Sequence, residues 1–172
     1  SLILPAIAQQ LERRCAGRRW RIVVAGEGPL APSLEASIAT ENVGHRVQML
    51  GWQADPARVF LAADVVLHPT LWEGLPRVLI EAHAAGLASV ASDITGNREV
   101  VTNETGFLCP PRSAAAYADR LARLVTDATL RTSMARAARQ RAESHFDAAA
   151  NNQRIIALYD TLLGSPFRPV KH

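Results

Sequence analysis

The sequence is poor in aromatic residues, has few cysteines and contains no long apolar run. Its 172 residues are 48% hydrophobic and 20% charged but only 5% aromatic. This composition is typical of one globular domain with enough apolar surface to bury a core. No apolar run approaches the roughly 20 residues that a membrane-spanning helix needs. The sequence therefore predicts no transmembrane helix within its own length.

Patterns typical of metal sites are also absent. The two cysteines, Cys15 and Cys109, form no C-x-x-C pair and have no potential ligands at metal-binding spacing. We expect both to be free thiols in a reducing compartment, which predicts a cytoplasmic protein. No D-x-D pair and no other cluster of His, Cys, Asp or Glu has the spacing of metal ligands. We therefore expect no metal and no other cofactor.

Lysine is almost absent, because Lys171 is the only lysine among the 19 basic residues. Arginine supplies nearly all the positive charge, and the formal net charge is +3. The arginines are spread along the chain and do not form a basic stripe interleaved with aromatic residues, the pattern of nucleic-acid-binding surfaces. The sequence therefore predicts no nucleic-acid partner, while a local site for an anion is compatible with its charge.

Short β-branched runs alternate with segments of helical periodicity. The runs predict strands at Arg21–Ala25, Arg46–Leu50, Asp64–His68, Ala88–Ala91 and Gly106–Cys109. Helices are expected in residues 1–16, 30–40, 56–62, 113–126, 128–145 and 148–163, with another between Pro76 and Gly86 and a helical turn at 97–101. We expect Ser113, Asp127 and Asp147 to be N-cap residues. This alternation is typical of an α/β fold with a Rossmann-like parallel sheet and helices on both faces.

The start of the chain differs from that of a complete domain of this class. The chain begins inside a helix, although a doubly wound domain normally begins with a strand. We therefore expect residues 1–163 to be one domain, cut from a longer chain and missing its first strand. The domain is expected to end in two or three consecutive helices, and residues 164–172 to form a flexible tail.

A glycine-rich turn follows the first expected strand. Gly26, Gly28 and Ala31 match the G-x-G-x-x-A pattern of dinucleotide-binding turns. That fingerprint requires an acidic residue about 20 residues later to hold a ribose, and the next expected strand ends in QMLGW without one. We therefore favour a tight turn that brings backbone amides near a phosphate or sugar over a site for a nicotinamide or flavin.

The stretch WEGLPRVLIEAHAAGLASVAS predicts a helix followed by a strand. Pro76 suits the first helical turn, and Gly86 suits the position just past the last turn. Because the segment between them is almost wholly apolar, we expect this helix to be buried on most sides. Yet Glu73 precedes the helix and Glu81 lies in its middle. A buried carboxylate needs hydrogen-bond donors, and vicinal sugar hydroxyls are suitable ones.

A structural explanation for Glu81 is an ion pair with Arg77, four residues earlier, which we expect to be partly buried. The functional explanation is that Glu81 binds the hydroxyls of a ribose, oriented by Arg77, while Glu73 binds a second set of hydroxyls. The amides of Leu75, Arg77 and Val78 at the helix start suit a diphosphate. A nucleoside diphosphate joined to a sugar would satisfy all of these groups.

Two histidines lie in apolar surroundings. His68 is on an expected strand and His83 is on the expected helix. Lone histidines in such places are usually core residues whose hydrogen bonds are satisfied, and we assign both to the core. Ser89 and Ser92 lack the G-x-S-x-G elbow of an acyl-transfer nucleophile, so we expect no chemistry of that kind.

The segment from Pro69 to Pro110 resembles the group 1 glycosyltransferases, the retaining family 4 enzymes of GT-B fold. The donor domain of these enzymes carries a glutamate, seven residues, a second glutamate, then an alanine and a helix-ending glycine. Here the matching residues are Glu73, Glu81, Ala82 and Gly86. The turn 26–29, Gly51, Glu99 and the pair 105–106 also fall where this family has them. The resemblance covers nearly all of the chain and implies the C-terminal, donor-binding half of a GT-B fold in residues 1–163.

The resemblance implies a role for each motif. Glu81 would bind the ribose of the donor nucleotide, and Glu73 would contact the transferred sugar as the catalytic residue. Gly51 and Trp52 would lie near the base, and the turn of Gly26 and Gly28 would lie near the ligand. The diphosphate would be held by the segment Gly74, Leu75, Pro76, Arg77 and Val78. The family needs no metal, which agrees with the missing D-x-D pair.

The resemblance also implies parts that lie outside this sequence: an Arg/Lys pair that neutralises the leaving diphosphate, and an N-terminal acceptor domain. We therefore expect a hexosyltransferase of polysaccharide or glycolipid biosynthesis as the full-length protein, and an inactive isolated chain. Any contact with the inner face of the membrane would be peripheral and made through the full-length protein. Two alternatives stay open: a nucleotide-binding or scaffolding domain without catalysis, and a nucleotide-sugar epimerase of the same fold.

Overall fold

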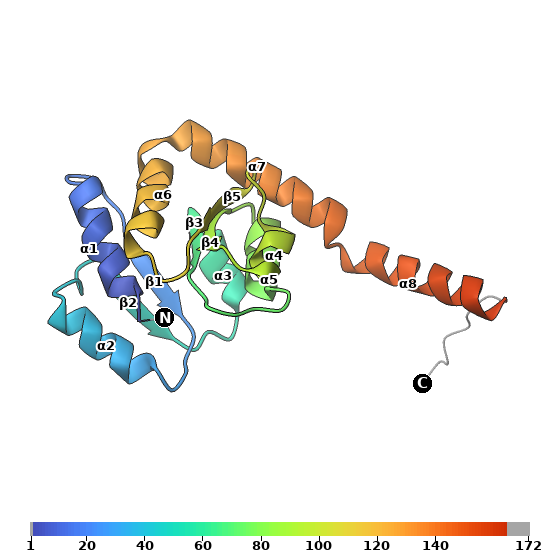
Figure 1. Cartoon of the computed structure of the whole chain (residues 1–172), viewed down its shortest axis with the longest axis horizontal. Helices are drawn as coiled ribbons and strands as arrows, with labels where there is room; N and C mark the ends of the chain where they lie inside the picture. The colour runs from blue at the N-terminus through green and yellow to red at the C-terminus, as the bar shows by residue number, and fades with distance from the viewer. Residues whose placement is uncertain (1, 165–172) are drawn as a thin grey trace.

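The computed structural model describes residues 2–164 of the chain. Within this part, five short strands alternate with helices (Figure 1). The strands are β1 (Ile22–Ala25), β2 (Val47–Gly51), β3 (Val65–His68), β4 (Ala88–Ser92) and β5 (Gly106–Cys109). The helices are α1 (Leu4–Arg14), α2 (Ala31–Thr40), α3 (Pro56–Leu61), α4 (Arg77–Ala84), α5 (Thr95–Val100), α6 (Ala114–Thr126), α7 (Ala128–His145) and α8 (Ala148–Leu163). The expected tail lies outside the described residues apart from Gly164.

The strands lie within one residue of the limits expected from the sequence, because each apolar β-branched run is bounded by turn residues or a helix start. The first helix is shorter than expected. It begins at Leu4, with Pro5 in its first turn, where the missing N–H removes no intrahelical hydrogen bond. The expected α/β class is confirmed.

The strands form two parallel sheets, which the sequence did not indicate. β1 pairs with β2 in one sheet, and β4 lies between β3 and β5 in the other. In the described part of the chain no ladder joins the two sheets, so β1 and β3 each pair on one side only. The register of β1 and β2 shifts between Val24 and Ala25, at the entry to the glycine-rich turn.

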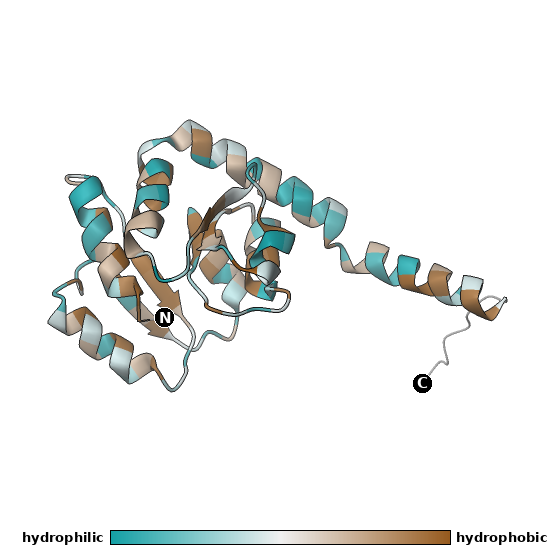
Figure 2. Ribbon diagram, in the orientation of Figure 1, coloured by the Kyte–Doolittle hydropathy of each residue, from teal (hydrophilic) through white to brown (hydrophobic). Residues whose placement is uncertain are grey.

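Helices cover both faces of the three-stranded sheet. All five residues of β4 are buried, and consecutive residues of β4 face different cores. Val90 packs in a core with residues of α1 and α6, such as Leu11 and Tyr117. Ala91 packs in a second core with residues of α4, such as Leu79. The strands are accordingly among the most apolar segments of the chain (Figure 2).

The two cysteines are buried free thiols, as expected. Cys15 directly follows α1, and Cys109 ends β5. Burial raises the pKa of the Cys109 thiol to about 11 and also raises that of Cys15. Both thiols are therefore protonated at neutral pH and have little nucleophilic character.

The described chain ends in three consecutive helices, each with the expected cap. The capping oxygens of Ser113, Asp127 and Asp147 accept hydrogen bonds from the N–H groups of Ala116, Leu130 and Ala150. Helix α7 packs against α4 and α6, whereas α8 projects away from the body (Figure 1) and has no buried residue. Within residues 2–164, no helix combines the length and the apolarity needed to cross a bilayer.

Replacing Asp127 with alanine should lower the free energy of unfolding by about 1 kcal/mol, the usual cost of a lost N-cap. Its carboxylate lies 2.8 Å from the N–H of Leu130, and α7 is part of the packed body. The matched control is Asp147→Ala, which removes an equivalent bond of 2.7 Å from α8. Because α8 buries nothing, the control should leave the urea transition, followed by tryptophan fluorescence, unchanged. Equal losses in both variants would show that α8 unfolds with the body.

Candidate functional site

The loop that joins β3 to α4, residues 69–76, carries the predicted site residues toward the start of α4. Pro76 is the N-cap residue, with φ −76° and ψ 95°, so α4 begins at Arg77, one residue later than expected. The first hydrogen bond of the helix is donated by Leu79. Among the described residues, the N–H groups of Leu75, Arg77 and Val78 have no acceptor. These three N–H groups are unpaired, as the sequence predicted for a helix start; their binding of an anion stays a prediction.

One face of α4 is open to solvent, so the expectation of a helix buried on most sides was wrong. Leu79 and Ala82 are buried, whereas Arg77, Val78 and Glu81 are exposed. Arg77 Nη2 lies 3.5 Å from Glu81 Oε1, with side chains 87% and 44% exposed. The expected partly buried ion pair is therefore an exposed one, which contributes about 0–1 kcal/mol. Glu81 is a candidate ligand-binding residue because solutes can reach it, not because burial forces it to find donors.

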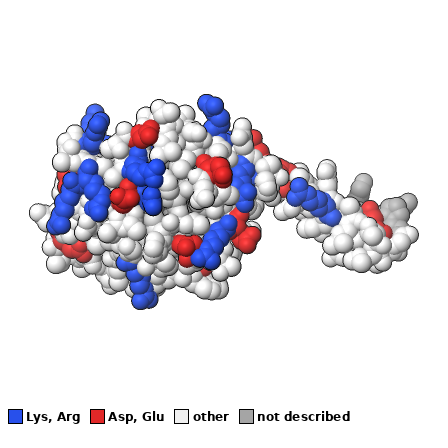
Figure 3. Space-filling model, turned by 45° about the horizontal axis from the view of Figure 1, so that its top comes forward, with Lys and Arg blue, Asp and Glu red and all other residues white. Residues whose placement is uncertain are grey.

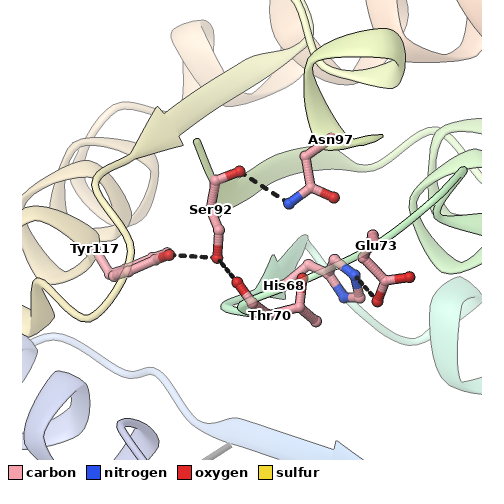
Figure 4. Close-up of polar contacts among 6 residues, drawn as sticks. All are labelled: His68, Thr70, Glu73, Ser92, Asn97 and Tyr117. Atoms are coloured by element: carbon pink, nitrogen blue, oxygen red, sulfur yellow. Dashed lines mark hydrogen bonds and ion pairs between the residues drawn. The ribbon is translucent and has the colours of Figure 1, made fainter. Parts of the chain in front are cut away.

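Glu73 contacts His68 across the base of loop 69–76 (Figure 4). The distance from His68 Nε2 to Glu73 Oε1 is 3.2 Å, and the two side chains are 12% and 31% exposed. Burial lowers the pKa of His68, and the Glu73 carboxylate offsets part of that effect. The sequence predicts His68 to be a core residue without a functional role. The structure instead places it against the predicted catalytic residue, a contact that depends on how the loop turns back over the strand.

The other histidine, His83, has the core position that the sequence predicted. It is fully buried on α4, and its Nε2 lies 3.1 Å from Ser89 Oγ. Burial lowers the pKa of His83 to about 4, and the positive charge of Arg141 acts in the same direction. His83 is therefore a neutral structural residue at physiological pH.

The backbone that carries Glu73 packs against the first turn of α5. A Cβ atom added to Gly96 would lie 2.6 Å from the carbonyl oxygen of Glu73 and closer still to that of Gly74. Only glycine lets α5 approach this closely, so Gly96 fixes the position of the loop backbone. No local pattern in the sequence indicates a special role for Gly96. The stretch SDITGNRE contains it, but the need for glycine there is visible only in three dimensions.

A buried hydrogen-bond chain holds the loop from the other side (Figure 4). The Tyr117 hydroxyl donates to Ser92 Oγ at 2.7 Å, and Ser92 Oγ donates to the carbonyl oxygen of Thr70. Asn97 Nδ2 donates to the carbonyl oxygen of Ser92 at 2.9 Å. In residues 2–164, the buried Thr70 Oγ1 and Asn97 Oδ1 have no partner. Loop 69–76 is thus tied to the end of β4 and, through Tyr117, to α6.

The glycine-rich turn and the end of β2 form a second group of predicted site residues. Gly26 has φ 126°, and its N–H donates to the carbonyl oxygen of Gly51 at 2.7 Å. The N–H of Trp52 donates to the Glu27 carboxylate at 3.2 Å, while the Trp52 side chain is 67% exposed. The structure therefore places the turn at Gly26 and Glu27 beside Gly51 and Trp52.

This turn borders a hollow of about 320 Å³, lined by residues 24–31, Leu34 and Met49. Loop 69–76 does not line this hollow. The glycine-rich turn and loop 69–76 each follow the carboxyl end of a parallel strand, but the two strands belong to different sheets. That is the usual location of ligands in α/β proteins.

Charges of both signs are intermixed on the surface, and the face drawn in Figure 3 shows no continuous patch of one sign. Asp93 and Arg98 form one such mixed pair, with Oδ1 and Nε 2.6 Å apart. Within the described residues, no group of three or more His, Cys, Asp or Glu is placed to hold a metal ion. Arg77, with a side chain 87% exposed, and the helix-start amides place positive charge at the start of α4.

Residues 2–141 match the family model described as glycosyl transferases group 1. The chain belongs to this family. Two curated relatives of this group 1 domain illustrate the match. The UDP-Gal:alpha-D-GlcNAc-diphosphoundecaprenol alpha-1,3-galactosyltransferase of Escherichia coli is 33% identical over 139 residues, covering 80% of this chain and 36% of the relative. The D-inositol 3-phosphate glycosyltransferase of Corynebacterium diphtheriae is 34% identical over 170 residues, covering 92% of this chain and 38% of the relative.

Solved structures of glycosyltransferases have the same fold as this group 1 domain. Anabaena Alr3699/HepE in complex with UDP superimposes with a TM-score of 0.83 at 25% identity, covering 93% of this chain and 44% of that one. The sucrose-phosphate synthase of Thermosynechococcus elongatus gives 0.79 at 26% identity, covering 93% and 42%. These matches correspond to the C-terminal domain of the GT-B fold. The group 1 domain spans less than half the length of the relatives it matches.

Replacing Gly96 with alanine should displace loop 69–76, because the new methyl group would overlap the carbonyl groups of Glu73 and Gly74. Overpacking of this kind costs about 1–3 kcal/mol in stability. The matched control is Gly28→Ala, where an added Cβ meets nothing within 4 Å. Thermal unfolding compares the variants, and NMR of the His68 imidazole reports the loop directly. An unshifted His68 resonance with wild-type stability in Gly96→Ala would contradict the close approach.

Proposed function

We propose that this chain is the donor-binding half of a glycosyltransferase that moves a sugar from a nucleoside diphosphate to an acceptor. The main support is that Glu73 and Glu81, with side chains 31% and 44% exposed, flank a helix start. The amides of that helix start have no acceptor among the described residues. A nucleotide sugar carries hydroxyl groups on both sides of a diphosphate. The hydroxyl groups match the two carboxylates, and the diphosphate matches the N–H groups between them. Membership of the group 1 family supports the same ligand class.

Each part of the site has a proposed partner on the donor. The Glu81 carboxylate accepts hydrogen bonds from the ribose, and the Glu73 carboxylate accepts them from the sugar that is transferred. The amides of Leu75, Arg77 and Val78 bind the diphosphate, together with the backbone of Gly74, and the exposed Arg77 guanidinium adds positive charge. Negative charge on the leaving diphosphate is stabilised best by donors that are already oriented before the reaction.

The proposed position of the base is beside Gly51 and Trp52, across from the turn of Gly26 and Gly28. The exposed indole of Trp52 offers a flat apolar surface to a nucleobase. Alr3699/HepE, whose fold this chain shares, was solved with UDP and with UDP-glucose. Uridine diphosphate is therefore the first nucleotide to test.

The acceptor of the transferred sugar would bind outside this chain. Because the chain spans about two fifths of its relatives, we assign acceptor binding and the cations that neutralise the leaving group to other parts of the full-length protein. We further propose that the transfer retains the anomeric configuration, as in family 4. An acceptor of polysaccharide or glycolipid biosynthesis, met in the cytoplasm or at the inner membrane face, fits relatives such as the E. coli enzyme.

Glu81→Gln should weaken binding of free uridine diphosphate and of the donor alike. A lost charged hydrogen bond is worth about 1.5–3 kcal/mol, so affinity should fall by about 10- to 150-fold. The ribose is unchanged by the reaction, so the loss should appear mainly in KM. Isothermal titration calorimetry with uridine, guanosine and adenosine diphosphates identifies the base and measures the effect.

Glu73→Gln is the matched comparison for Glu81→Gln. Free nucleoside diphosphate lacks the transferred sugar, so it makes no contact with a residue that binds only this sugar. Nucleotide affinity should stay intact while kcat falls, since the Glu73 charge faces the cationic centre that forms in the transition state. Melting curves of both variants separate binding effects from stability defects. The same loss of nucleotide affinity in both variants, or no loss in either, would refute the two roles. Binding without transfer in the wild-type full-length protein would favour a scaffolding domain.

Activity of the full-length protein should not depend on a divalent metal. Among the described residues no carboxylate cluster is placed to bind one, and helix-start amides with cations can carry the diphosphate charge instead. The measurement is turnover after treatment with EDTA and after readdition of Mg²⁺ or Mn²⁺. Loss of activity that either ion restores would show that the diphosphate is stabilised by a metal.

A further inference from the structure

The contact between His68 and Glu73 points to a role for His68 beyond the core. We propose that His68 is a positioning residue: its Nε2–H holds one carboxylate oxygen of Glu73 and leaves the other oxygen free for a sugar hydroxyl. This rests on the proposed function of Glu73. The two atoms are 3.2 Å apart, and the second carboxylate oxygen points away from the imidazole (Figure 4).

His68 is itself held rigidly. It is the last residue of β3 and pairs in register with Ala91 of the fully buried strand β4. Its side chain is only 12% exposed. A group on a strand end positions a neighbour more accurately than a group on a loop, because the strand cannot shift without breaking its ladder. Glu73, by contrast, is on a loop and depends on such contacts for its orientation.

The other contacts of loop 69–76 fix its backbone and leave the carboxylate of Glu73 unconstrained. Gly96 packs against the carbonyl groups of Glu73 and Gly74, and Ser92 binds the carbonyl oxygen of Thr70. In the described part of the chain, the structure gives the Glu73 carboxylate one hydrogen-bond partner, His68. His68 therefore determines the rotation of the carboxylate about its last side-chain bond.

The protonation state of His68 follows from its surroundings. Burial lowers the pKa of His68 from its ordinary value, so the imidazole is neutral at physiological pH. An ionised carboxylate only accepts hydrogen bonds, so the single ring proton must lie on Nε2. A neutral donor orients Glu73 without cancelling its charge. The charge thus stays available to a positive centre that develops on the sugar.

The test compares two substitutions of His68 in the full-length protein. His68→Leu keeps the volume and removes the donor, whereas His68→Gln places an amide N–H near the position of Nε2. We expect His68→Leu to lower kcat by about 10- to 100-fold, the usual effect of a misplaced reacting group. The affinity for free uridine diphosphate should be unchanged, and His68→Gln should recover most of the turnover. His83→Leu is the matched control, because it removes a second buried neutral imidazole outside the site and should leave kcat per folded molecule unchanged.

The positioning role would be overturned by wild-type kcat in His68→Leu, or by equal losses in the Leu and Gln variants. A fall in nucleotide affinity matching the fall in kcat would also refute it. If the wild-type protein binds no nucleoside diphosphate, the proposed function fails and the sugar-positioning role fails with it. Nucleotide binding together with full activity of His68→Leu rejects the positioning role alone.

A second measurement does not depend on activity or on the stability of the His68 variants. NMR titration of the His68 imidazole in the 172-residue chain reports whether the pair exists in solution. Because the Glu73 carboxylate raises the pKa of His68, Glu73→Gln should lower it further. An unchanged His68 titration in Glu73→Gln would show that the carboxylate and the imidazole do not meet.

Discussion

The close packing of the α5 start against the turn at Glu73 and Gly74 is the constraint on which the candidate site depends. Gly96 allows it, and the hydrogen bond from Ser92 to the Thr70 carbonyl holds the same loop from the side of β4. Both supports come from elements that follow the loop in sequence. The chain therefore completes its site only when β4 and α5 have been placed, which makes the loop conformation a product of the whole three-stranded sheet.

The candidate site combines few formal charges with the partial charges of backbone N–H groups. The N–H groups of Arg77 and Val78 carry partial positive charge at a fixed place, and the ion pair of Arg77 with Glu81 is exposed enough to open for a ligand. His68 is neutral beside Glu73 and so leaves its charge intact. The site thus presents acceptors at its two ends and donors between them.

Local patterns in the sequence were sufficient to predict most of the fold. The β-branched runs located the strands, and Ser113, Asp127 and Asp147 marked helix starts, because both signals act over a few residues. Such local patterns do not predict contacts between segments that are distant in the sequence. The approach of Gly96 to Glu73, and the turn of the loop that brings Glu73 onto His68, require the tertiary arrangement. The exposure of Glu81 was misjudged because apolar residues such as Val78 also lie on the open face of α4.

The division of the strands into two sheets has a consequence for the motions of the molecule. In the described residues, the ladder of β1 with β2 shares no hydrogen bond with the ladder of β3, β4 and β5. Their protection from hydrogen exchange therefore depends on the apolar core that both ladders share, in which Val47 of β2 belongs with Val90 of β4. The slowest exchange belongs to β4, which is buried along its whole length.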